Sequence, residues 1–155
     1  MDALEKATSY LSRKPHTEKE VIDYLLRKGY EQEESDEAVR RLREYGYLDD
    51  LAYAKLYFEY GFEKGRGRER IVRELAGKGV AGDLIEQAYS ELEDVPDERE
   101  MARQIAEQVV LEAGKEPDEM SYEEKQKLQA RIARRLASRG FSGSICWSTA
   151  RDAVK

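Results

Sequence analysis

Apolar residues recur along the chain at intervals of three and four, the spacing that places side chains on one face of an α-helix. Few stretches alternate apolar and polar residues in the way that a half-buried β-strand requires. The pattern therefore predicts an all-α protein. The strongest apolar pairs, each one helical turn apart, are Val21 and Leu25, Ile71 and Leu75, and Ile132 and Leu136.

These three predicted helices end in the same way, at Gly29, Gly79 and Gly140. Each glycine follows a basic residue and precedes an apolar one. Glycine can adopt the left-handed conformation that ends a helix, and the next apolar side chain then folds back on the last turn. The basic residue lies where the helix dipole is negative. The repetition indicates that one structural unit occurs three times in the chain.

Amphipathic stretches before and after each of these helices give every unit three short helices. We expect three tandem, helix-turn-helix-like repeats, at residues 1–49, 50–95 and 96–155, the third with a longer loop near 112–121. Units of this size are near the lower limit for independent folding. They should therefore lean on one another or remain hinged, which gives an elongated, curved molecule.

Several helix starts are also visible in the sequence. Capping boxes of the form Ser/Thr-x-x-Glu begin at Thr17 and Ser121. Asp49 and Asp50 lie where an N-cap is needed, and Leu48 is positioned as the hydrophobic staple. A metal site at the two aspartates is disfavoured because no further oxygen ligands follow at calcium-loop spacing.

Composition narrows the class of protein. Of the 155 residues, 39% are charged, which suits helices with large solvated faces. No apolar run approaches the roughly 20 residues that span a bilayer, and no secretory signal pattern is present at the N-terminus. A single cysteine provides neither a disulfide nor a cysteine metal cluster. We expect a soluble, cytoplasmic protein.

Catalytic chemistry has few candidate residues. The one histidine, His16, precedes a helix start and is interpreted as a surface or N′ residue, because no nucleophile motif accompanies it. Cys146 is interpreted as a small buried apolar residue. No phosphate-binding loop is present. The sequence predicts a protein that is not an enzyme, with no catalytic residues, cofactor or metal.

The basic clusters are the candidate partner-binding residues, although such runs are often only solvated helix faces. From Lys125 to Arg139 the chain has six basic residues and no acidic one. Because like charges at helical spacing repel, this run indicates a partner outside the chain. The net charge of −6 disfavours a protein that coats bare nucleic acid. The candidates are Arg66, Arg68, Arg70, Arg73 and Lys78 in the second unit and Lys125, Lys127, Arg131, Arg134, Arg135 and Arg139 in the third.

Aromatic and acidic residues add a second, weaker set of interface candidates. Tyr53 and Tyr57 belong to an aromatic stripe that either packs in the core or forms an interface hot spot. Asp49 and Asp50 are possible contacts as well, since capping uses only one carboxylate.

Three ordered blocks resemble the RecX family. They are Gly46-Tyr47-Leu48-Asp49-Asp50 with Tyr53-Ala54, Lys64-Gly65-Arg66-Gly67-Arg68-Glu69-Arg70-Ile71 with Lys78-Gly79-Val80, and Arg135-Leu136-Ala137-Ser138-Arg139-Gly140-Phe141-Ser142. The resemblance covers nearly the whole chain.

This resemblance implies a regulator that lies in the groove of the RecA–DNA filament. Such a protein would limit filament extension, ATP hydrolysis, strand exchange and the co-protease activity of the SOS response, and so modulate recombination and DNA repair. The expected partner is the RecA filament, with DNA bound weakly or through the filament, no membrane contact, and a monomeric state. Neutralising Arg131, Arg134 and Arg135 together is expected to weaken filament binding without unfolding the chain.

The alternative is a DNA-binding regulator of the helix-turn-helix type, since three-helix units include such readers. The acidic balance of the chain disfavours it, as does the lack of an evident dimerisation segment. A sequence reader would bind naked DNA tightly, with a steep dependence on salt.

Overall fold

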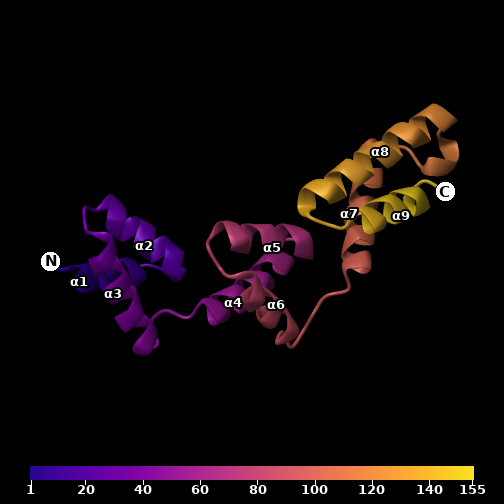
Figure 1. Cartoon of the computed structure of the whole chain (residues 1–155). Coiled ribbons are helices and arrows are strands. Elements are labelled where there is room, and N and C mark those ends of the chain that lie inside the picture. The colour runs from indigo at the N-terminus through magenta and orange to yellow at the C-terminus, as the bar shows by residue number, and fades with distance from the viewer. The chain divides into compact units, whose positions relative to one another are not determined.

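A computed structural model describes all 155 residues, and its secondary structure is entirely helical (Figure 1). The all-α prediction is confirmed. The helices are α1 (Ala3–Leu11), α2 (Glu18–Arg27), α3 (Gln32–Glu44), α4 (Asp50–Glu63), α5 (Arg68–Gly77), α6 (Gly82–Ser90), α7 (Glu98–Ala113), α8 (Tyr122–Arg139) and α9 (Gly143–Ala153), with one 3-10 turn at Pro117–Glu119.

Contacts between residues divide the chain into two compact units. The N-terminal unit comprises residues 1–59 and 72–92, and the C-terminal unit comprises residues 60–71 and 93–155. Two boundaries of these units fall inside α4 and α5, and the third, at 92/93, falls between α6 and α7, whereas all the sequence-based boundaries fall between helices. The division into repeats at 1–49, 50–95 and 96–155 therefore stays a prediction.

In the N-terminal unit, α1, α2 and α3 form a three-helix bundle around fully buried Val21 and Leu25. Leu48 is buried in the same core, and its role as a hydrophobic staple for α4 stays a prediction. The polar first turn of α3 does not prevent this helix from packing on α1 and α2. Ser35 is buried, and its hydroxyl donates to the Glu31 carbonyl (2.9 Å). Ala38, Val39 and Leu42 complete the buried face.

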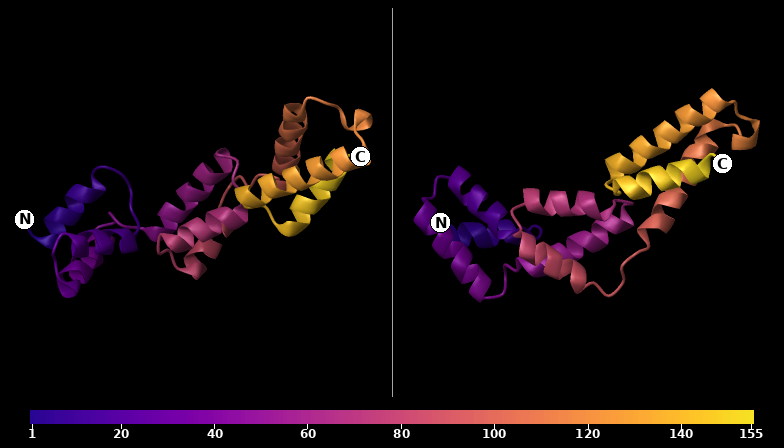
Figure 2. Two further views of the ribbon diagram at one scale, coloured as in Figure 1. Left: turned by 90° about the horizontal axis from the view of Figure 1, so that it is seen from above. Right: turned by 45° about the vertical axis from the view of Figure 1, so that its right-hand side comes forward.

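In the C-terminal unit, α9 packs against both α7 and α8, and the three helices lie together in all the views of Figures 1 and 2. Ile132 and Leu136 of α8 are fully buried at the centre of this bundle. Cys146 is 3% exposed, so the interpretation of this residue as a buried apolar side chain is confirmed.

The additional residues of the third predicted unit lengthen helices as well as the connection between them. Helix α8 has 18 residues, whereas α2 and α5 have 10 each. The connection at 114–121 contains the 3-10 turn. The sequence analysis placed the extra length in a loop. Part of it lies in α8 as well, because a run of good helix formers ahead of Leu128 extends this helix.

The predicted helix ends are confirmed. Complete capping boxes begin α2 at Thr17 and α8 at Ser121. Gly29, Gly79 and Gly140 have φ angles of 96°, 89° and 93°. None of the helices combines the length and the apolar character that crossing a membrane requires.

Candidate partner-binding surface

The basic residues around α5 have mostly intramolecular contacts. The Arg66 guanidinium lies 5.3 Å from the centre of the Tyr60 ring, and Arg70 lies within 3.5 Å of the Ser138 carbonyl. Lys78 lies 5.5 Å from the centre of the Tyr57 ring, with its Nζ 3.7 Å from Glu20. Within this cluster Arg73 is exposed and has no acidic partner. Part of the cluster therefore has a structural role.

The α8 cluster is compensated from a neighbouring helix. Glu112 of α7 accepts from Arg131 (3.1 Å) and Arg135 (3.5 Å). The inference that this run needs a partner outside the chain to balance its repulsion is therefore wrong for these two arginines. The counter-charge comes from a residue that is distant in sequence but adjacent in the bundle.

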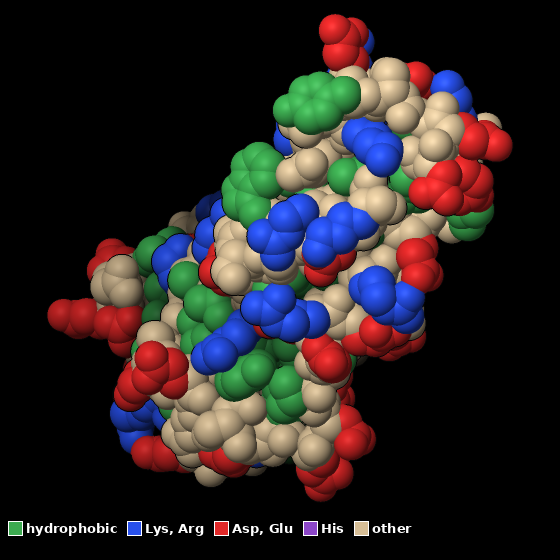
Figure 3. Space-filling model, turned by 90° about the vertical axis from the view of Figure 1, so that its right-hand side faces the viewer, with side chains coloured by type: hydrophobic (Ala, Val, Ile, Leu, Met, Phe, Trp, Pro, Cys, Tyr) green, Lys and Arg blue, Asp and Glu red, His purple; other side chains and the backbone are tan.

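Two α8 cations remain exposed without an acidic partner, Lys127 and Arg134. They are seven residues apart, which places them two turns apart on one side of the helix, roughly 10 Å from each other. Figure 3 shows exposed lysine and arginine side chains on the face drawn, among hydrophobic and acidic ones. Unpaired, exposed cations are the groups that are available to an anionic partner.

The remaining α8 candidates occupy the ends of the helix. Lys125 is half-buried in the first turn, and no ion pair holds it. Arg139, in the last turn, lines a small pocket of about 390 Å³ together with Phe62 and Gly65. These positions make Lys127 and Arg134 the better candidates for a partner contact.

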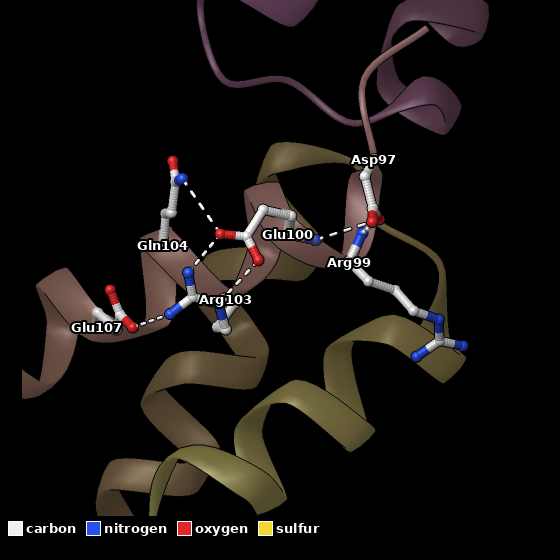
Figure 4. A network of polar contacts seen from close by, with 6 residues as sticks. All are labelled: Asp97, Arg99, Glu100, Arg103, Gln104 and Glu107. Atoms are coloured by element: carbon white, nitrogen blue, oxygen red, sulfur yellow. Dashed lines mark hydrogen bonds and ion pairs between the residues drawn. The ribbon is translucent and has the colours of Figure 1, made fainter.

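A larger groove of about 790 Å³ lies in the C-terminal unit between α7, α9 and the segment at Glu116. Its floor includes Val110 and Ala153, and its rim is charged. On the rim, Arg103 pairs with both Glu100 and Glu107, and the Asp97 carboxylate accepts from the Arg99 and Glu100 amides (Figure 4). The lining as a whole has five acidic residues and two basic ones, so the groove disfavours an anionic ligand.

The two candidate aspartates cap two different helices. Asp49 accepts from the Ala52 amide (3.1 Å) at the start of α4, as the sequence predicted. Asp50 accepts from the Glu18 amide (3.0 Å) at the start of α2, 32 positions away. Burial raises the pKa of Asp50 above its ordinary value despite this hydrogen bond. Both carboxylates thus hold the fold, and their predicted contact with a partner is untested.

The candidate tyrosines pack on one another. Tyr53 and Tyr57 stack with ring centres 6.1 Å apart. Burial, with Glu20 and Asp50 nearby, raises the pKa of Tyr53 to about 12. Both rings are half-buried. Their role in packing is therefore evident, whereas a role in binding stays a prediction.

His16 is not a surface residue, which corrects the sequence-based interpretation. The residue is 8% exposed, and its ring stacks on Tyr10 with centres 3.9 Å apart. Its Nδ1 lies 3.6 Å from the Glu20 carboxylate. The N′ position was predicted correctly, but the aromatic neighbours that cover the ring belong to α1 and could not be located from sequence alone.

Acidification is expected to destabilise the N-terminal unit through His16. Burial lowers its pKa below 6.5, although Glu20 partly opposes this. Between that lowered pKa and 6.5 the unfolded chain binds more protons than the folded one, so stability is complete above pH 6.5 and falls as pH decreases. The melting temperature should therefore decrease between pH 7 and 5.5, and less steeply in His16→Phe, which keeps the stacked ring. Equal slopes for the two proteins would contradict this assignment.

A helix-end joint connects α2 and α5 within the N-terminal unit. The Thr17 hydroxyl, at the start of α2, donates to the Lys78 carbonyl at the end of α5 (2.6 Å). At Gly79, an added Cβ would lie 2.4 Å from the Lys19 Cβ. The positive end of one helix dipole thus meets the negative end of the other.

A second helix-end joint connects α5 and α8 within the C-terminal unit. The Gly67 amide, at the start of α5, donates to the Arg139 carbonyl at the end of α8 (2.7 Å). A Cβ at Gly140 would lie 2.1 Å from the Arg70 Cβ. The sequence identified both glycines as helix stops but gave no sign that they also permit this close approach.

Comparison with known proteins identifies two matching family models. One, described as RecX, first three-helix domain, matches residues 3–42, and the other, described as RecX, second three-helix domain, matches residues 49–88. A crystal structure of RecX from Lactobacillus salivarius superimposes with a TM-score of 0.79 over 97% of this chain and 94% of that chain, at 23% identity. This likeness shows the fold.

Curated relatives named Regulatory protein RecX match almost the whole chain. The protein from Lactobacillus delbrueckii subsp. bulgaricus is 35% identical over 155 residues, which cover 98% of this chain and 54% of the relative. The one from Vibrio campbellii is 34% identical over 142 residues, covering 92% and 85%. The chain thus spans about half the length of the Lactobacillus relative but most of the Vibrio one.

Proposed function

Because the chain belongs to the RecX family, we propose that it regulates the RecA recombinase by binding the RecA–DNA filament and inhibiting its activities. These are filament extension, ATP hydrolysis, strand exchange and co-protease activity, and the protein would act on recombination, repair and the SOS response in the cytoplasm. Family membership across most of the chain carries the proposal. The proposed role is binding rather than catalysis.

The proposed contact on α8 consists of Lys127 and Arg134, the two exposed cations of that helix without an acidic partner. A protein–DNA filament repeats the same protein surfaces and DNA phosphates along its length. Several weak contacts to such a lattice combine into strong binding, because each contact after the first is intramolecular. Charge of this kind steers and orients the protein more than it adds affinity.

The test is co-sedimentation with RecA on single-stranded DNA and a non-hydrolysable ATP analogue, together with inhibition of the RecA ATPase. Lys127→Ala with Arg134→Ala is expected to raise the half-inhibitory concentration about tenfold, since two exposed charge contacts contribute about 1.4 kcal/mol. This pair is preferred to Arg131 and Arg135, whose removal leaves Glu112 unpaired.

The matched control is Arg13→Ala with Arg27→Ala, which also removes two exposed cations without acidic partners. It should change the inhibition less than about twofold. Equal loss in both double variants would overturn the assignment to α8. If the unsubstituted chain neither co-sediments nor inhibits, the proposed function is wrong, and tight, sequence-dependent binding to naked DNA would favour a helix-turn-helix reader instead.

A further inference from the structure

The two helix-end joints use one arrangement. In each, the residue before a middle helix donates a hydrogen bond to the carbonyl of the basic residue that ends another. The Thr17 hydroxyl donates to Lys78, and the Gly67 backbone amide donates to Arg139. In each, the following glycine lies where a side chain would collide with the first turn of the capped helix. We call a helix C-terminus that has this basic residue and glycine a glycine end.

Helix α2 has a glycine end with nothing docked on it. Lys28 and Gly29 correspond to Lys78 and Gly79, and Gly29 has the same left-handed backbone, with a φ of 96°. A Cβ added there meets no atom within 4 Å. No hydrogen bond to the Lys28 carbonyl is formed. The C-terminal end of α2 thus has the geometry of the two joints, but no helix start docks on it.

Helix α8 begins with the matching half. The Ser121 hydroxyl accepts from the Glu124 amide (3.2 Å), as Thr17 does from Glu20 (3.2 Å), but no acceptor receives its proton. In the α2–α5 joint the docked side supplies Lys78, whose Nζ lies 3.7 Å from Glu20. At the start of α8 the exposed Lys115 of the same copy takes that place, with its Nζ 3.2 Å from Glu124. The capping box of α8 thus matches that of α2, and a docked lysine would share Glu124 with Lys115.

We infer that the glycine end of α2 in one copy of this chain docks on the start of α8 in a second copy, so that copies associate head to tail. The Ser121 hydroxyl donates to the Lys28 carbonyl, Gly29 lies over Glu123 as Gly79 lies over Lys19, and opposite dipole ends meet. A second copy is the occupant because this chain itself has the complementary Ser-x-x-Glu box. The inference is independent of the proposed function.

Such association is weak. One hydrogen bond and the close approach of one glycine form the α2–α5 joint, whereas stable interfaces bury roughly 1,000 Å² or more. Because the contact joins two different surfaces, each copy keeps one half for a further copy. We therefore expect monomers in dilute solution and association at high concentration.

The test is cross-linking of two single-site variants with a short bismaleimide. Arg27→Cys places a thiol at the exposed end of α2 and Glu123→Cys places one at the exposed start of α8, while the native Cys146 is buried. Mixed at high concentration, they should form dimers in greater yield than either variant alone. The unsubstituted chain, cross-linked in parallel, gives the background.

Two substitutions interrupt the contact while keeping each helix end. Gly29→Asn tolerates the left-handed backbone but introduces the colliding Cβ. Ser121→Asp still caps α8 but has no proton to donate. Each should reduce the mixed cross-link about tenfold, the equivalent of one hydrogen bond of about 1.4 kcal/mol.

The matched control is Gly114→Asn, at a left-handed glycine with a φ of 73° and no atom within 4 Å of an added Cβ. Placed in the Glu123→Cys partner, it should leave the yield unchanged. Equal losses from Gly29→Asn and Gly114→Asn would overturn the inference. Sedimentation of the unsubstituted chain as a monomer at every concentration tested would also overturn it.

Discussion

Gly140→Ala is expected to lower the free energy of unfolding of the C-terminal unit by about 3 kcal/mol. Two independent effects add. The φ of 93° is strained for any residue with a Cβ, and that Cβ would lie 2.1 Å from the Arg70 Cβ and 2.6 Å from the Arg70 amide nitrogen. Because the obstacle includes backbone, it cannot move aside as the tip of a flexible side chain would.

The measurement is urea unfolding followed by Trp147 fluorescence and circular dichroism, since the single tryptophan lies in α9 of this unit. Gly114→Ala provides the comparison, because its φ of 73° carries the backbone strain without any collision. It should cost about 1 kcal/mol. Similar losses in the two variants would mean that the close packing of Gly140 on α5 contributes nothing.

Thr17→Val should destabilise the N-terminal unit by about 3 kcal/mol, although the two side chains have nearly the same volume. The Thr17 hydroxyl is fully buried, accepts from the Glu20 amide and donates to the Lys78 carbonyl. Valine removes both hydrogen bonds and leaves the partly buried Lys78 carbonyl and the Glu20 amide without these partners. The loss thus exceeds that of an ordinary helix cap.

Two controls separate the cap from the joint. Ser121→Ala removes the same kind of capping box at an exposed helix start and should cost about 1 kcal/mol. Thr17→Ser keeps the hydroxyl and loses only a methyl group, about 0.8 kcal/mol. The measurement is urea unfolding together with hydrogen exchange of the α2 amides. If Thr17→Val costs no more than Ser121→Ala, the hydrogen bond across the joint is not stabilising.

The helices and their ends were predictable because their causes are local. Apolar spacing predicted the buried faces, and the structure buries Val21, Leu25, Ile71, Ile132 and Leu136. A capping box needs only residues three apart, and a left-handed stop needs only a glycine. The resemblance to the RecX family rested on motifs of the same short range, and the comparisons confirmed it.

The candidate surface was predictable only in part, because charge is compensated across helices. Sequence spacing placed Lys127, Arg131 and Arg134 near one another on α8, yet only the structure showed that Glu112, 19 residues before Arg131, pairs with that arginine. The same limit applies to His16, whose covering ring comes from α1. Neither contact can be recognised from the residues that are adjacent to it in the sequence.

The sequence by itself thus determined the fold class, the helix stops and the family, since each depends on neighbours within a few positions along the chain. The tertiary structure decided which cations remain available, which carboxylates cap a distant helix, and that the stops at Gly79 and Gly140 also form joints. Those outcomes depend on pairs such as Thr17 and Lys78, 61 positions apart. Only packing brings such groups within hydrogen-bonding distance.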